Sequence, residues 1–174
     1  MKKSISTELS PANIAKVMET LAESPIRLEA LSKSVSAPSG KLRQPLGKGE
    51  RTATEVLAHL INGEARSSEM IYQALLTNEP FFAEIHPERH WGKLLRFDLL
   101  DFSDLLAYFK LRRKVLLRVL SGLKEKDWAR AVREEGKQRK ESVYWRARSL
   151  ALHESEHVDE LERKILKKVN SLVE

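Results

Sequence analysis

Two histidines one helical turn apart are the residues of this chain best placed to do chemistry. His153 and His157 lie in a segment, 141–174, that contains no glycine or proline, so we predict one long helix there. Residues at positions i and i+4 share a helix face, so both imidazoles can point at one ion. Neutral imidazole is the commonest protein ligand of transition metals. The pair therefore predicts part of a metal site.

A third histidine, His59, lies in a second long helical stretch far upstream. Three histidine ligands leave open positions on a metal, which is the arrangement of a reactive site and not of a closed structural one. His59 shares a helix stripe with Gly63 and Ser67, whose small side chains would leave room for a ligand. Small residues equally permit close helix packing, so both interpretations of Gly63 and Ser67 stay open.

The run from His153 to His157 also matches H-E-x-x-H, the pattern of zinc proteases. Those enzymes hold an extended peptide along an edge strand, and this sequence has few strand signals. In addition, Glu154 falls in the middle of the apolar stripe of its helix, where it cannot easily act on a metal-bound water. That stripe consists of Val143, Ala147, Leu150, Val158, Leu161, Ile165 and Leu172. We therefore reject a protease.

A carboxylate in an apolar stripe, such as Glu154, must be paired or protonated, because an unpaired buried charge is too costly. Arg112 falls at the centre of another predicted stripe, formed by Leu105, Phe109, Leu116, Val119 and Leu120. We expect Arg112 to pair with Glu154 or to hold an anionic group of a substrate. Alternatively, the Arg112 guanidinium extends to the edge of a helix bundle.

Helix-start and helix-stop signals delimit four long segments. Ser10 and Pro11 open the first, in which Pro25 predicts a kink or a break. After a loop at 32–51, Thr52 and Glu55 form a capping-box pattern at the start of the second, which continues to about Thr77. The third runs from Asp101 or Ser103 to Gly122, and the fourth opens at Glu141 or Ser142.

The predicted architecture is all-α: a four-helix bundle with long first and third connections, forming a single domain over 1–174. The sequence predicts a short helical turn at 123–128 and a loose hairpin at 129–140. In the irregular stretch 81–101, His90 is a candidate for the mouth of a pocket, although a plain surface position is the commoner case. Bundles commonly bind metals between facing helices, as the three histidines would require.

Composition narrows the classes of function. The chain has no cysteine, which excludes disulfides, zinc ribbons and a catalytic thiol. Its formal charge of +6 favours plain solubility over nucleic-acid binding, because the basic segments lack interleaved aromatic residues. A weaker alternative is a nucleic-acid-binding bundle that uses Lys110, Arg113, Lys114 and Arg118. No secretion signal or membrane span is evident, and we expect a cytoplasmic protein.

An ordered set of segments resembles the DinB-like superfamily of small metal-binding four-helix bundles. The matching pieces are 52–60 followed by Glu64, then 109–116, 120–130 and 142–157. The resemblance extends from about Asn13 to Lys167. One departure is Arg51, which stands where the family often has tryptophan just before the helix cap.

The resemblance implies a divalent metal, often nickel or zinc, held by His59, His153 and His157 with water completing the shell. Members with known activity are metal-dependent thiol transferases or related isomerases that use a low-molecular-weight thiol. We therefore expect a metal-dependent transferase or hydrolase that acts on a small molecule. The alternative is a non-catalytic binding or stress-response protein that keeps the metal site.

The resemblance also implies a homodimer. Trp145 and Leu152 lie one above the other on the face of the last helix opposite its core stripe, with Leu166 nearby. A second chain would bury these side chains in a symmetric dimer. The alternative is that segment 81–101 covers them within one chain.

Overall fold

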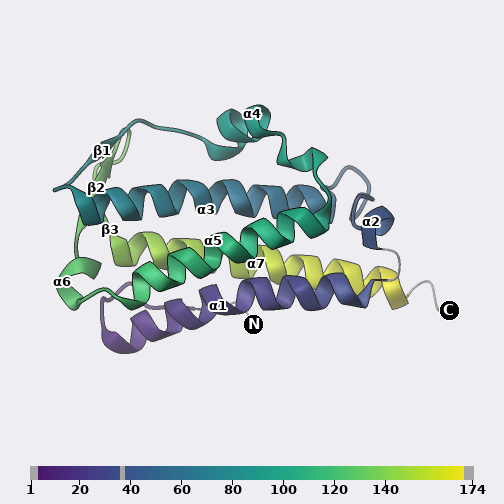
Figure 1. The fold of residues 1–174 in the computed structure, drawn as a ribbon, viewed down its shortest axis with the longest axis horizontal. Helices are drawn as coiled ribbons and strands as arrows, with labels where there is room; N and C mark the ends of the chain where they lie inside the picture. The colour runs from purple at the N-terminus through teal and green to yellow at the C-terminus, as the bar shows by residue number, and fades with distance from the viewer. Residues whose placement is uncertain (1–3, 36–37, 171–174) are drawn as a thin grey trace.

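Four long helices form a bundle in the computed structural model, which describes residues 4–35 and 38–170 (Figure 1). They are α1 (Pro11–Ser34), α3 (Ala53–Leu76), α5 (Phe102–Ser121) and α7 (Val143–Asn170). Both α1 and α3 pack against α5 and α7. The predicted all-α four-helix bundle with long first and third connections is confirmed. None of the helices built from the described residues combines the length and the apolar character that a membrane crossing needs.

The predicted caps form where α1 and α3 begin. The side chain of Ser10 accepts a hydrogen bond from the backbone N–H of Asn13. The Thr52 hydroxyl accepts from the Glu55 N–H at 3.0 Å, and the Glu55 carboxylate accepts from the Thr52 N–H at 2.7 Å. This reciprocal capping box satisfies two backbone donors that a helix start otherwise leaves unpaired.

The sequence predicts a kink or a break at Pro25. The break does not occur, because α1 runs through this residue as one helix, and the kink stays a prediction. Proline lacks an N–H, so the carbonyl of Leu21, four residues earlier, loses its helical donor. Arg113 of α5 replaces that donor: its Nη1 lies 2.7 Å from the Leu21 carbonyl oxygen. A side chain from a neighbouring helix thus completes the hydrogen bonding of α1.

Short elements fill the connections. The first contains α2 (Pro38–Lys41); the second contains β1 (Phe81–Phe82), the π-helical turn η1 (Glu88–Gly92), α4 (Lys93–Leu95) and the 3-10 turn η2 (Phe97–Leu99). The third contains α6 (Glu125–Trp128), β2 (Ala131–Glu134) and β3 (Glu141–Ser142). Strand β2 pairs antiparallel with β3, which confirms the hairpin, and parallel with β1. Because Glu141 and Ser142 form β3, α7 begins at Val143 and not at Glu141 or Ser142 as predicted.

Two apolar clusters make up the core, one in each half of the bundle. The predicted stripe of α7 is buried at Val143, Ala147, Leu150, Val158, Leu161 and Ile165, while Leu172 lies outside the described residues. Along α3, α5 and α7, the positions between the two clusters carry Glu64, Arg113 and Glu154, each at most 1% exposed. A buried ionic layer therefore separates the two clusters.

The face of α7 that motivated the dimer is largely covered by its own chain. Trp145 is half-buried, with the guanidinium of Arg139 4.0 Å and that of Arg148 5.2 Å from its ring centre. Leu152 packs against the core, and Leu166 is 50% exposed. These side chains do not form one open apolar patch, so this face gives the dimer no support. The dimer stays a prediction.

Candidate metal centre

His59 of α3 and the histidine pair of α7 converge on one point, as the sequence predicts. The Nε2 atom of His59 lies 3.0 Å from Nε2 of His153 and 3.1 Å from Nε2 of His157. The ring centres are 4.7 to 4.8 Å apart, with the rings edge-on to one another. All three side chains are half-buried, so their shared point is sheltered but reachable from solvent.

This donor set fits a divalent transition-metal ion. An imidazole nitrogen carries either a proton or a lone pair, so Nε2 of His59 cannot donate to one neighbour while it accepts from the other. Ligand nitrogens about 2.1 Å from a common ion lie roughly 3.0 to 3.4 Å from one another. The observed 3.0 and 3.1 Å fall in that range.

The local environment of His157 favours its neutral form, which can bind a metal. Burial lowers the pKa of His157, and the neighbouring charges of His153 and Arg51 act in the same direction, while Glu160 opposes them. A histidine with a lowered pKa stays neutral at physiological pH, which is the form that binds metals.

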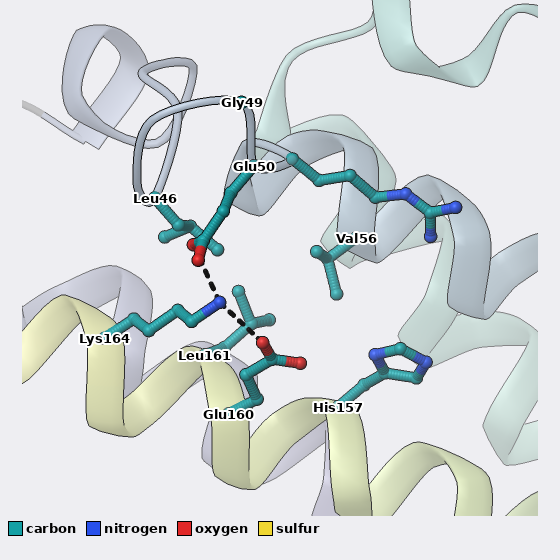
Figure 2. A pocket seen from close by; sticks show the side chains of 9 residues that line it. Leu46, Gly49, Glu50, Val56, His157, Glu160, Leu161 and Lys164 are labelled. Atoms are coloured by element: carbon teal, nitrogen blue, oxygen red, sulfur yellow. Dashed lines mark hydrogen bonds and ion pairs between the residues drawn. The ribbon is translucent and has the colours of Figure 1, made fainter.

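Two pockets reach the histidines. The larger, of about 400 Å³, contains His157 and is called here the His157 pocket; Figure 2 shows His157 on α7 at its edge, facing Val56 of α3. The smaller, of about 180 Å³, contains His59 together with Asn62 and Gly92, and is called the His59 pocket. A substrate can therefore approach the candidate ligands from two sides.

A model of the DinB superfamily matches residues 8–161, which is most of the chain. The chain belongs to the DinB superfamily. A solved structure from Bacillus subtilis, YfiT, is similar over 94% of each chain, with a TM-score of 0.78 and 19% sequence identity. That protein is described as a probable metal-dependent hydrolase with an unusual four-helix bundle topology. A search of curated proteins gave no match.

The sequence of this DinB superfamily member also predicts Gly63, Ser67 and His90 near the site, and they differ in how close they lie to the three histidines. A Cβ on Gly63 would be 3.8 Å from Cε1 of His153, an ordinary contact distance, so Gly63 lies directly beside a candidate ligand. Ser67 is half-buried and lines neither pocket. His90 is exposed, its Nδ1 accepts from the His86 N–H, and it also lines neither pocket.

The predicted pair of Arg112 with Glu154 is wrong by one residue. Glu154 is fully buried and paired, but its partner is Arg113, whose Nη2 lies 2.5 Å from the Glu154 carboxylate. Arg112 is half-buried and donates to the hydroxyl of Ser68 at 3.0 Å. The predicted stripe of α5 included the half-buried Val119 and left out the buried Phe102 and Leu106, which shifted its centre by one position.

The sequence analysis also missed the importance of Glu64. Arg113 lies 3.6 Å from the Glu64 carboxylate as well, so one guanidinium serves two buried carboxyl groups. Burial raises the pKa of Glu64 to about 7, although the charge of Arg113 opposes this rise. The two carboxylates raise the pKa of Arg113, despite its own burial. The family pattern includes Glu64, but the sequence carries no signal that pairs it with Arg113.

Proposed function

We propose that this protein is a metal-dependent enzyme that acts on a small molecule, as a hydrolase or a transferase. His59, His153 and His157 would hold the ion, with nickel or zinc as the leading candidates. The observation that carries the proposal is the convergence of three Nε2 atoms, at 3.0 and 3.1 Å, on a half-buried point beside two pockets.

An ion at this point would activate a bound water or thiol as a nucleophile near neutral pH. The chain has no cysteine, so a thiol would enter as a low-molecular-weight cosubstrate. The His157 pocket, at about 400 Å³, is in the size range of small-molecule sites. The description of YfiT supports the hydrolase alternative, and the resemblance to thiol transferases supports the other.

The buried ionic layer positions the candidate ligands. Glu154 follows His153 directly on α7, and its carboxylate is bound by Arg113 of α5. Because a helix turns about 100° per residue, fixing Glu154 also fixes the direction in which His153 and His157 point. Arg113 therefore acts on the centre through the rotation of α7, as a positioning residue.

The test is turnover with defined metals. Protein loaded with nickel or zinc is incubated with a chromogenic ester, and separately with a low-molecular-weight thiol and an electrophilic aryl halide. We expect turnover in one assay, lost in metal-free protein and in the His153→Ala variant. Stoichiometric metal without turnover on either substrate class would instead support the non-catalytic alternative.

A further inference from the structure

Asn62 lies three residues after the candidate ligand His59 on α3, so the two side chains share a face of the helix. Only 3% of Asn62 is exposed, and the residue lines the His59 pocket. Its side-chain amide offers one acceptor oxygen and an NH2 group with two donors. A group bound by this amide would therefore lie close to the candidate metal centre.

The Asn62 amide forms no hydrogen bond with the residues that the structure describes. Its Oδ1 atom is buried without a partner, and none of the hydrogen bonds between these residues uses Nδ2. Asn13 is also buried and shows the usual arrangement, because its Nδ2 donates to the carbonyl oxygen of Glu8 at 3.0 Å. An unpaired amide is costly to bury, since its polar atoms lose their hydrogen bonds to water. Asn62 therefore does not serve the stability of α3, and binding a ligand is a role that explains it.

Gly92 of η1 keeps the space beside this amide open. The position that a Cβ would take on Gly92 is 3.4 Å from Nδ2 of Asn62. The backbone there is right-handed helical, with a φ of −58°, so the turn itself does not require glycine. Gly92 also lines the His59 pocket, so a ligand oxygen close to this position is within reach of the Asn62 donors.

The charged side chains around the His59 pocket favour a neutral ligand over an anion. They are Arg51, Glu55 and Asp98. Asp98 has a cationic partner, Arg96 at 3.0 Å, whereas Glu55 accepts its hydrogen bond from the uncharged backbone of Thr52. An anion in this pocket would face the carboxylate of Glu55, and a neutral ligand would not be repelled by it.

The size and the remaining wall of the pocket narrow the ligand further. At about 180 Å³ the pocket is smaller than those that enclose whole drug-sized molecules, so it holds a small ligand or one end of a larger one. Ala58 and Phe97 give it an apolar surface for an alkyl part. A fitting ligand therefore has a neutral acceptor oxygen at Asn62 and an alkyl part on this wall, which describes a carbonyl compound.

We propose that Asn62 is a specificity-determining residue of this site, and that its Nδ2 donates a hydrogen bond to the carbonyl oxygen of a small neutral substrate in the His59 pocket. The inference rests on the metal-centred activity proposed above and adds the class of substrate, such as an ester or an amide. An aryl halide has no such oxygen, so the inference favours the hydrolase. It assigns Asn62 a role in binding and none in the activation of the nucleophile.

The first test follows two probes by nuclear magnetic resonance in metal-free protein. Butanone presents a neutral carbonyl that only accepts hydrogen bonds, and propionate has the same number of heavy atoms but carries a charge. The side-chain NH2 signals of Asn62, assigned by their loss in Asn62→Leu, and the backbone N–H signal of Gly92 report binding. We expect both to shift saturably with butanone, which should bind at least about fivefold more tightly than propionate.

Two variants test the contact from its two sides. Asn62→Leu keeps the approximate shape of the side chain and removes the donor, while Gly92→Ala places a methyl group in the space beside it. Each should weaken butanone binding about tenfold, which is the size of one lost hydrogen bond. The matched control is Gly122→Ala at the C-cap of α5, outside the His59 pocket, and it should leave butanone binding unchanged. Wild-type affinity in both test variants would overturn the inference.

A second measurement separates a role in binding from a role in folding. Asn62→Leu removes an unpaired buried amide, so the melting temperature of the ligand-free protein should rise by about 2–4 °C. A fall of the melting temperature, tighter binding of propionate, or no shift of the Asn62 signals with butanone would each overturn the inference. Wild-type protein that takes up no nickel or zinc would instead contradict the proposed function, because the probe titrations use metal-free protein.

Discussion

Nη1 of Arg113 donates a hydrogen bond to the carbonyl oxygen of Leu21 at 2.7 Å. This is the oxygen that Pro25 leaves without a donor inside α1. The same guanidinium binds Glu154 on α7 and approaches Glu64 on α3. One side chain of α5 thus connects all the long helices of the bundle at the level between the two apolar clusters.

Arg113→Met should destabilise the protein strongly, because it leaves the buried Glu154 without its cation and Glu64 with only the more distant Arg112. We expect a loss of about 3–5 kcal/mol in the free energy of unfolding, measured by urea denaturation. Arg112→Met is the matched control, since that side chain is half-buried, binds Ser68 and approaches Glu64 only to 4.0 Å. Its cost should stay below about 1.5 kcal/mol. Equal costs for the two variants would contradict the assignment of Arg113.

Pro25→Ala should partly rescue Arg113→Met. Alanine restores an N–H that can bind the Leu21 carbonyl, so the loss of Arg113 no longer leaves this oxygen unpaired. A double-mutant cycle on the urea data should give a coupling of about 1–2 kcal/mol between the two positions. Additive effects would mean that the Leu21 carbonyl finds another donor without Arg113.

Glu64 should make the stability depend on pH. Its pKa is about 7 in the folded protein against an ordinary value of 4.5, so the folded state holds the proton more tightly. The resulting stabilisation is complete below pH 4.5 and is lost as the pH rises towards 7, by about 3 kcal/mol in total. Glu64→Gln, which stays neutral, should remove this loss. Parallel pH profiles of the wild type and the variant would refute the raised pKa.

Gly63→Ala should leave metal binding intact, because the added methyl group meets His153 at an ordinary contact distance of 3.8 Å. Alanine also favours a helix interior, so we expect the unfolding free energy to rise by about 0.5–1 kcal/mol. Gly63→Leu should push against the His153 ring and weaken metal affinity. Calorimetric titration with zinc measures both variants, and unchanged affinity in Gly63→Leu would place Gly63 away from the centre.

The sequence predicted correctly those features that depend on residues close together along the chain. The caps at Ser10 and Thr52 use side chains within three residues of the backbone groups they bind. The shared direction of His153 and His157 follows from helix geometry alone. His59 joined them because the facing helices of a bundle bring distant segments together.

The features that the sequence did not predict depend on contacts between distant segments. Pro25 lies inside an unbroken α1, and the Leu21 carbonyl that it leaves without a helical donor is bound by Arg113 from another helix. The choice between Arg112 and Arg113 depends on the rotation of α5, which packing against the other helices decides. Arg51 reaches both pockets through a loop that folds back on Leu46, which no periodic pattern encodes.

Metal content tests the central claim most directly. Protein purified without an affinity tag is dialysed with nickel or zinc, then against buffer alone, and its metal is measured by elemental analysis. The account predicts about one ion per chain in the wild type and in the control His90→Ala, and almost none in the alanine variants of His59, His153 or His157. Metal-free wild-type protein, or full occupancy in the triple alanine variant, would contradict it.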